Sequence, residues 1–219
     1  MTRIFTLDDA GSFAWIAHPG ESMQRASSAV VTSIGTLVID PVDFGGLDDA
    51  LRRLGPVAGV VQLLDRHNRD VAAVAARLSV PVLVPGALAG RGEPLAITGV
   101  QERVVLAMPG WNEAALWFPE RRLLVCAEAI GTAPYYRARD TDVLGIHPFL
   151  RVRPPTGALS GIAPSVIAVG HGPPVVDDAA SALVAALRQS RRDLPRVWLR
   201  GARLIIRRKR QTQRPHRAK

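Results

Sequence analysis

The sequence predicts an α/β protein in which two facing β-sheets carry helices on their outer faces, a four-layer αββα sandwich. Three observations predict this class. Residues 59–84 have the pattern of a buried strand, a helix and a second buried strand, residues 94–126 that of four closely spaced strands, and residues 165–192 that of a strand followed by a helix. The first pattern requires a parallel strand pair with a right-handed crossover, whereas the second is typical of an antiparallel meander.

The first predicted elements are a β-hairpin and a helix. β-branched residues at 29–32 and 36–39 flank a short turn that contains Gly35, which is typical of a hairpin. The pair Asp40–Pro41 ends the second strand. From residue 47 to residue 54, apolar side chains recur at spacings of three and four, which predicts a helix with one buried face.

The β-α-β unit follows this helix. Residues 59–64 form a nearly continuous apolar run, which suits a strand that is buried on both faces. Six polar residues at 65–70 end this strand abruptly. A helix over 71–78 and a second buried strand over 80–84 complete the unit.

The middle of the chain changes character. We predict four short strands, separated by turn signals and forming a meander, at residues 94–98, 103–107, 114–118 and 123–126. A stretch rich in Pro and Gly at 133–161 is predicted to be loop with one short helix.

The last predicted elements are a strand and a helix. The strand covers 165–169 and leads into Gly-His-Gly at 170–172. Asp177 or Asp178 is a suitable N-cap for a final helix that runs to about residue 192.

Composition excludes several classes of protein. The chain has 219 residues, of which 47% are hydrophobic and 21% charged, as in an ordinary globular domain. A single Cys excludes a disulfide framework and a Cys-rich zinc site. The first twenty residues include Arg3, Asp8 and Asp9, unlike a signal peptide, and no apolar run reaches the length of a transmembrane helix. We therefore expect a cytoplasmic protein without a transmembrane segment.

The net charge of +9 is distributed unevenly. Residues 188–219 hold 13 Lys and Arg and one acidic residue, whereas residues 1–187 hold 15 Lys and Arg and 18 acidic residues. We expect one domain over residues 1–193 and a basic, partly disordered tail over 194–219. The tail has the electrostatics to contact nucleic acid or an anionic membrane, and the alternative is a solubilising extension without a partner.

Polar side chains that could bind a ligand follow three of the predicted strands. Asp65, His67 and Asp70 follow the first strand of the β-α-β unit, Glu128 follows the last strand of the meander, and His171 follows the final strand. Ligands in α/β proteins bind at such strand ends. If the three ends meet, two imidazoles and up to three carboxylates are enough to hold a divalent metal ion.

The order of these motifs resembles the metallo-β-lactamase fold superfamily over roughly residues 13 to 190. That family has an early strand ending in Asp, a His-x-His-x-Asp-His metal motif, a Pro-Gly-His segment, a strand ending in Gly-Asp and a closing Gly-His-Gly. The similar segments of this chain, in the same order, are 36–41, 64–70, 108–111, 124–129 and 169–173. The resemblance implies an αββα sandwich and metal-dependent hydrolysis.

The metal motif departs from the family pattern at most of its ligand positions. Only the second histidine is kept, as His67, while Asp65 and Asp70 stand at the outer histidine positions and Arg69 stands at the aspartate position. An arginine keeps its proton at working pH, so Arg69 places a permanent positive charge where a second cation would lie. We therefore do not expect a dinuclear zinc site.

Two further ligand positions also differ. Trp111 replaces the third histidine, and Glu128 replaces the aspartate that bridges the metal ions in the family. The usual mechanism of the family uses one or two zinc ions to lower the pKa of a bound water to about 7 and so form a hydroxide nucleophile. With these replacements, at most a single metal ion is expected here.

Three interpretations of this cluster remain open at the level of the sequence. In the first, one Zn, Mn or Fe ion is bound by four residues, Asp65, His67, Glu128 and His171. In the second, Arg69 replaces the metal, pairs with Asp65, Asp70 or Glu128 and leaves an anion-binding pocket. In the third, the cluster is a polar network that only fixes the loops.

These interpretations lead to two hypotheses about function. The first is a divergent hydrolase of a small ester, thioester or anionic substrate, in which the four metal-binding residues are catalytic and Arg69 and Asp70 contact the ligand. The alternative is a non-catalytic protein that has lost the metal site and binds an anion or a partner. A nucleophile elbow and a Gly-rich phosphate loop are both absent from the sequence.

Overall fold

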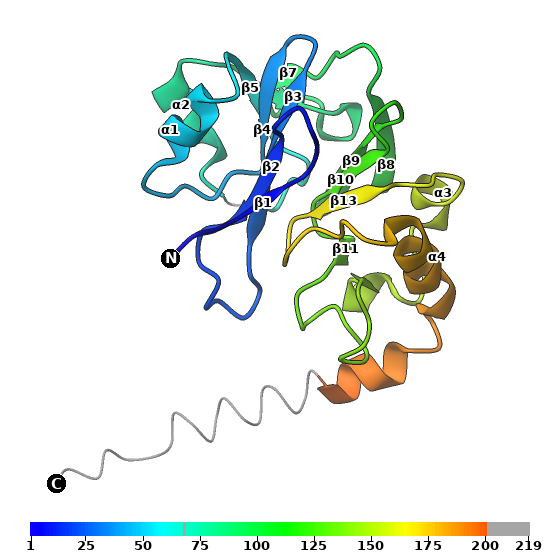
Figure 1. The fold of residues 1–219 in the computed structure, drawn as a ribbon. Coiled ribbons are helices and arrows are strands. Elements are labelled where there is room, and N and C mark those ends of the chain that lie inside the picture. Colours follow the sequence, from blue (N-terminus) through cyan, green and yellow to red (C-terminus); the bar gives the residue numbers. More distant parts are fainter. Residues whose placement is uncertain (68, 201–219) are drawn as a thin grey trace, which may run out of the picture.

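Two β-sheets face each other in the computed structural model of the chain, which describes residues 1–67 and 69–200 (Figure 1). The first sheet has seven strands in sequential order: β1 (Arg3–Thr6), β2 (Phe13–Ile16), β3 (Ala26–Thr32), β4 (Gly35–Ile39), β5 (Val57–Val61), β6 (Val82–Val84) and β7 (Glu93–Pro94). The second has four strands, which are named here in chain order: β8 (Gln101–Met108), β9 (Trp111–Phe118), β10 (Leu123–Cys126) and β13 (Val166–Val169).

The outer layers are helical. α1 (Leu47–Arg52) and α2 (Val71–Leu78) cover the first sheet, and α3 (Thr156–Leu159) and α4 (Ala179–Gln189) lie against the second (Figure 1). A small two-stranded ribbon, β11 (Ile130–Gly131) with β12 (Gly145–Ile146), follows β10. The prediction of a four-layer αββα sandwich is confirmed. Among the described residues, no helix has the length and apolarity that crossing a bilayer requires.

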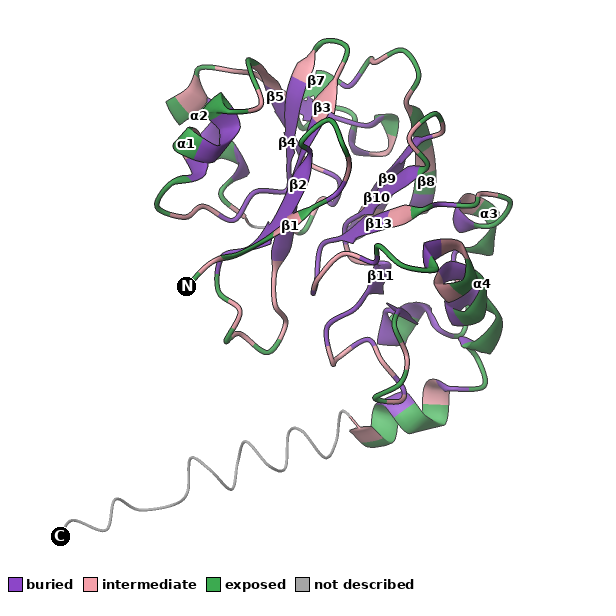
Figure 2. Cartoon of the chain, in the orientation of Figure 1, coloured by how far each residue is buried: buried purple, intermediate pink, exposed green. Residues whose placement is uncertain are grey.

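The parallel and antiparallel parts of the sheets follow the sequence pattern. β3 and β4 form the predicted antiparallel hairpin, and β4, β5 and β6 are parallel. In the second sheet β8, β9 and β10 form an antiparallel meander, and β13 pairs with β10 in parallel. The main core lies between the two sheets and extends to the buried faces of α3 and α4, and a second apolar cluster lies between the first sheet and helices α1 and α2 (Figure 2).

Some elements differ from the prediction, among them β12, which lies within the stretch at 133–161 that was predicted as loop. The run at 94–98 was expected to open the meander, but only Glu93–Pro94 is a strand, and it pairs in parallel with β6 at the edge of the first sheet. A proline is tolerated there because an edge strand leaves one row of backbone groups unpaired. Asp178 does precede the last helix, but its φ is +48° and its side chain makes no capping hydrogen bond.

The end of the described chain is helical. Residues 194–200 continue beyond α4 as a further helical segment, and Val197 within it is buried. The predicted domain boundary after residue 193 stays a prediction, and the rest of the predicted tail, residues 201–219, lies outside the described residues.

The two sheets are joined at one end, where the candidate site lies. After β5 the chain leaves the first sheet: Gln62 N still donates to Leu83 O at 3.1 Å, but Ala114 N of β9 donates to Leu63 O at 3.0 Å. At the other side of the same end, Ala26 N of β3 donates to Gly170 O at 2.8 Å. Backbone hydrogen bonds therefore hold the segment after β5 to β9 of the second sheet and the turn after β13 to β3 of the first sheet.

Candidate functional site

The two histidines of the predicted cluster meet. The centroids of the His67 and His171 rings are 5.7 Å apart, with the rings in an edge-to-face arrangement. His67 comes from the loop after β5 and His171 from the turn after β13. The prediction that these two distant strand ends converge is confirmed.

Two glycines bring His171 to this position. A Cβ on Gly170 would lie 2.0 Å from the carbonyl oxygen of Ala127, and one on Gly172, whose φ is +96°, would lie 2.3 Å from Thr132 Oγ1. Both positions therefore exclude a side chain, and Gly172 also needs the left-handed backbone that glycine adopts at low cost. The Gly-His-Gly sequence thus packs the end of β13 tightly against the end of β10.

Both imidazoles are oriented through Nδ1. His67 Nδ1 lies 3.1 Å from Asp40 Oδ2, and His171 Nδ1 lies 3.0 Å from the carbonyl oxygen of Met23. A carboxylate and a carbonyl only accept hydrogen bonds, so we assign the ring proton to Nδ1 in both residues. Each Nε2 then carries a lone pair, and both Nε2 atoms are buried without a hydrogen-bond partner in the described part of the chain.

The two imidazoles are electrically neutral at physiological pH. Burial, followed by the positive charge of Arg69, lowers the pKa of His67 below its usual value. The same two causes, together with His67, lower the pKa of His171 to about 3. Two neutral rings with free lone pairs accept hydrogen bonds and do not attract anions by charge.

Arg69 holds the two sheets together at this site. Its Nη1 donates to the carbonyl oxygens of Ala26 and, at 3.0 Å, Asp40, and its Nη2 donates to the carbonyl oxygen of Gly170 at 2.8 Å. These acceptors lie at the start of β3, the end of β4 and the end of β13. One guanidinium thus joins three strand ends from both sheets.

The second interpretation of the sequence, in which Arg69 pairs with Asp65, Asp70 or Glu128, does not describe the contacts of Arg69. Within the described residues its hydrogen bonds go to backbone carbonyls and not to Asp65, Asp70 or Glu128. The three carboxylates have other donors: the Asn112 side chain for Asp65, the backbone N–H of Asp43 for Asp70 and the Arg66 guanidinium for Glu128. The strand-end carbonyls are the remaining acceptors, and a guanidinium can reach several of them at once.

The two aspartates of the motif are engaged elsewhere. Asp65 Oδ2 accepts a hydrogen bond from Asn112 Nδ2 at 2.7 Å, so Asp65 fixes its loop to the start of β9. Asp70 is exposed and its Oδ2 accepts a hydrogen bond from the backbone N–H of Asp43 at 2.8 Å. Both carboxylates therefore join loops to the body of the domain.

Glu128 is paired with an arginine that the sequence analysis did not single out. Arg66 Nε and Nη2 both donate to Glu128 Oε2, at 3.0 and 2.8 Å, and the Arg66 guanidinium carbon lies 3.7 Å from the centroid of the Trp111 ring. The other oxygen, Oε1, is 3.7 Å from His147 Nε2. Trp111, which stands at a histidine position of the family, thus supports an ion pair through a cation–π contact.

Three further residues complete the site and were missed from the sequence. Tyr136 stacks on His171 with ring centroids 5.7 Å apart, and its hydroxyl is buried without a hydrogen-bond partner among the described residues. His147, within the stretch predicted as loop, packs edge-on against Trp111, with ring centroids 4.9 Å apart. No sequence signal marks Tyr136 or His147, because both come from the stretch at 133–161 that lacks periodicity.

The third missed residue is a fully buried carboxylate. Glu113 accepts hydrogen bonds from Trp111 Nε1 at 3.0 Å and from the backbone N–H groups of Glu128 and Ala129, both at 2.8 Å. Burial raises the pKa of Glu113 to about 7, although these hydrogen bonds act in the opposite direction. Alternation along β9 points this side chain inward, which was a usable signal. Glu113 holds the turn after β10 and so positions Glu128.

The residues present do not fit the zinc centre that the fold family implies. Of the four predicted ligands, the structure brings His67 and His171 together, whereas Asp65 and Glu128 are bound to Asn112 and Arg66. In the described ranges, no group of three or more His, Cys, Asp or Glu side chains is arranged to hold a metal ion. Catalytic zinc sites use three protein ligands, and here a guanidinium adjoins the His67–His171 pair. We derive no step through a metal ion.

Comparisons with known proteins give the fold. No protein-family model matches the sequence, and no curated protein matches it. Among solved structures, the chain is similar to a fragment of diflavin flavoprotein A 5 from Nostoc sp. PCC 7120, with a TM-score of 0.61 and 15% identity over 88% of this chain and 97% of that one.

Two metallo-β-lactamases are also similar. The enzyme from Pontibacter korlensis has a TM-score of 0.53 and 14% identity over 86% of this chain and 99% of its own. The metallo-β-lactamase DIM-1 has a TM-score of 0.52 and 12% identity over 86% of this chain and 97% of its own. Identities this low establish architecture only. The chain therefore has the metallo-β-lactamase fold, in a divergent form.

Proposed function

We propose that this chain is a non-catalytic member of the metallo-β-lactamase fold that binds a small polar ligand without a metal ion. The observation that carries the proposal is the position of Arg69. Its guanidinium donates to the carbonyls of Ala26, Asp40 and Gly170 beside the two histidines, and so joins strand ends at the place where the family holds its cations. A fixed positive charge there disfavours a divalent ion electrostatically.

The carboxylates support the same proposal. A general base for hydrolysis must reach the water it activates, either directly or through one further water. Asp65 is held by Asn112 and Glu128 by Arg66, each at the distance of a strong hydrogen bond. Asp40 is hydrogen-bonded to His67 and orients its ring. The acids of the cluster thus serve to fix loops and a histidine.

The unpaired polar atoms define the chemistry of the ligand. Among the described residues, His67 Nε2, His171 Nε2, Tyr136 Oη, Arg69 Nε and the second carboxylate oxygen of Asp65, Oδ1, are buried without a hydrogen-bond partner. The two imidazole lone pairs need donors, whereas the hydroxyl and the guanidinium N–H need an acceptor. Buried polar groups in native proteins are normally satisfied, by protein, water or ligand. A small molecule that has an N–H or O–H beside a carbonyl or acidic oxygen would satisfy both kinds of group.

Metal content separates this proposal from the hydrolase hypothesis. We expect protein purified without chelator to carry less than about a tenth of an equivalent of any transition metal, and its Tm to be unchanged after dialysis against EDTA. Elemental analysis and thermal melting measure both. About one equivalent of zinc, manganese or iron that is retained in His18→Ala but lost in His67→Ala would restore the hydrolase hypothesis, since His18 is exposed and distant in sequence.

Tyr136→Phe tests the ligand site directly. Removing an unpaired buried hydroxyl should leave the free energy of unfolding unchanged or slightly higher, because its desolvation is not offset by a hydrogen bond. A melting screen of small amides, carboxylic acids, phosphates, nucleotides and acyl thioesters should find ligands, since a ligand at a hundred times its Kd adds about 2.7 kcal/mol. These shifts should shrink in Tyr136→Phe and persist in Tyr135→Phe. Equal shifts in the two variants would place the ligand elsewhere.

A further inference from the structure

A second surface with unusual side chains lies at the end of the described chain. Three large apolar side chains are exposed there: Phe149 at 65%, Trp198 at 58% and Leu199 at 60%. The Phe149 and Trp198 rings are neighbours, with centroids 6.4 Å apart, although they are distant in sequence. We call these three residues the aromatic patch.

The exposure of the aromatic patch is fixed by packing on the opposite side. Val197 of the same helical segment is buried, with 4% of its surface exposed. Asp193 at the start of this segment is also buried, and it accepts hydrogen bonds from Arg139 at 2.7 Å and Arg196 at 3.0 Å. One face of the segment is thus anchored to the domain, and Trp198 and Leu199 are left on the other.

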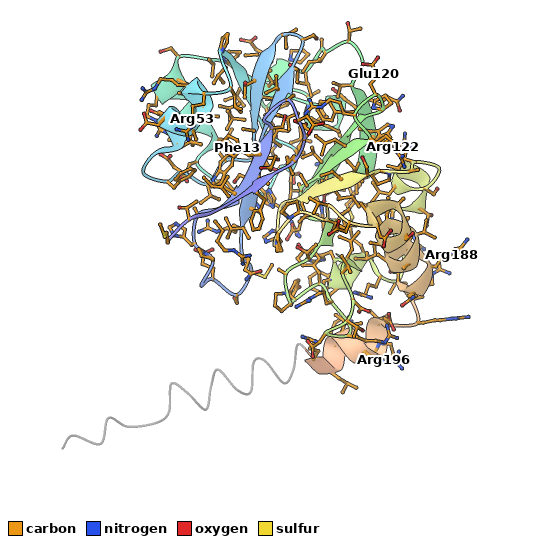
Figure 3. The ribbon with its side chains drawn as sticks, viewed as in Figure 1. Phe13, Arg53, Glu120, Arg122, Arg188 and Arg196 are labelled. Atoms are coloured by element: carbon orange, nitrogen blue, oxygen red, sulfur yellow. The ribbon has the colours of Figure 1, made fainter. Side chains whose placement is uncertain are left out.

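Arginines lie on α4 and on the helical segment that carries Trp198 and Leu199, and two of them, Arg196 and Arg200, pair with aspartates. Figure 3 shows Arg188 on α4 and Arg196 on the following helical segment, at the same end of the molecule. Arg200 follows directly after Leu199 and pairs with the exposed carboxylate of Asp140. Residues 201–219, which continue the chain from this point, contain eight Lys and Arg and no acidic residue.

We infer that the aromatic patch and the basic residues next to it bind the surface of an anionic lipid membrane. Trp and other large apolar side chains insert at the level of the lipid headgroups, and adjacent Lys and Arg are attracted to the anionic lipids. A nucleic acid would use the charge, but it would leave exposed Leu199 in water. A second copy of the chain would bring two strongly positive surfaces together, which is electrostatically unfavourable.

Tryptophan fluorescence of the full chain provides the test. Of the four Trp residues, Trp15, Trp111 and Trp117 are buried, so Trp198 is the one that water and quenchers reach. Vesicles of 70% phosphatidylcholine and 30% phosphatidylserine should shift the emission to the blue and reduce quenching by acrylamide. Pure phosphatidylcholine vesicles should have little effect, and raising the salt from 50 to 300 mM should release the protein.

Variants separate this inference from other partners. We expect Trp198→Ala/Leu199→Ser to reduce co-sedimentation with the anionic vesicles at least about tenfold. A fourfold substitution of Arg207, Arg208, Lys209 and Arg210 by Gln should reduce it similarly, whereas Ile34→Ser, at an equally exposed apolar side chain on the β3–β4 turn, should not. Vesicle binding that is unaffected by Trp198→Ala/Leu199→Ser would overturn the inference. So would binding to duplex DNA or RNA but not to vesicles, or a concentration-dependent dimer in which Trp198 is protected without lipid.

Discussion

Replacing Arg69 by methionine should lower the free energy of unfolding by roughly 3 kcal/mol. The guanidinium makes three charge-assisted hydrogen bonds to the carbonyls of Ala26, Asp40 and Gly170. Such bonds contribute about 1.5–3 kcal/mol each, and relief of the desolvation of a buried charge offsets part of the loss. Two of the carbonyls keep another donor, since Ser27 Oγ reaches Asp40 O and Ala26 N reaches Gly170 O, both at 2.8 Å. Urea unfolding followed by circular dichroism measures the change.

Two control variants make this result specific. Arg52→Met removes an arginine that is 75% exposed and pairs with Asp49, so it should cost less than about 1 kcal/mol. Arg69→Lys keeps the charge but cannot span three acceptors, and it should fall between wild type and Arg69→Met. If Arg69→Met were no more destabilising than Arg52→Met, the guanidinium would not be joining the two sheets, and the central support for the proposed function would be lost.

Much of the fold was predictable because short sequence patterns determine its strands, helices and turns. The apolar run before Asp65 and the helical spacing of residues 71–78 require a parallel pair with a covering helix, and the structure has both. The β3–β4 hairpin follows equally from its turn chemistry. The short strand at Glu93–Pro94 was assigned to the wrong sheet because nothing in a two-residue strand records which edge it joins.

The site was predictable only in part, for a physical reason. The sequence showed which polar residues directly follow predicted strands. His67 and His171 were therefore expected to meet, and they do. The partner of a charged side chain depends on competition among all nearby acceptors and donors in three dimensions. Glu128 therefore bound Arg66 rather than Arg69, and Arg69 bound carbonyls, which no spacing rule encodes.

The second large effect is a loss of stability in mild acid. The native fold keeps three imidazoles neutral: burial is the main cause that lowers the pKa of His147 to about 4, that of His171 to about 3, and that of His67 below its usual value. Unfolded histidine titrates near pH 6.5. Below that pH the unfolded chain binds protons that the native chain excludes, so the free energy of unfolding falls as the pH falls.

Glu113 acts in the opposite direction. Its pKa is raised to about 7 in the native fold, so the native chain takes up a proton there that an unfolded glutamate does not bind until about pH 4.5. This proton uptake by the native chain cancels the effect of one of the three histidines on the pH dependence of the free energy of unfolding. His147 and His171, with native pKa values of about 4 and 3, outweigh Glu113 by about one proton. At about 1.4 kcal/mol per proton and pH unit, stability should fall by at least about 1.4 kcal/mol per pH unit between pH 5.5 and 5.0, and the lowered pKa of His67 adds to this loss.

Urea unfolding at pH 7.5, 6.5, 5.5 and 5.0 measures this slope, and single variants assign it. His147→Gln should reduce the slope of the free energy of unfolding against pH by the equivalent of about one proton, because glutamine does not titrate. Glutamine can still accept the hydrogen bond from Phe149 N, so the fold should be kept. Glu113→Gln should make the slope steeper by about one proton, whereas His18→Gln, at an exposed position, should leave it unchanged. Constant stability from pH 6.5 to 5.0 in the wild type would mean that the imidazoles titrate normally in the native state. The buried histidine pair at the junction of the two sheets would then have to be open to water.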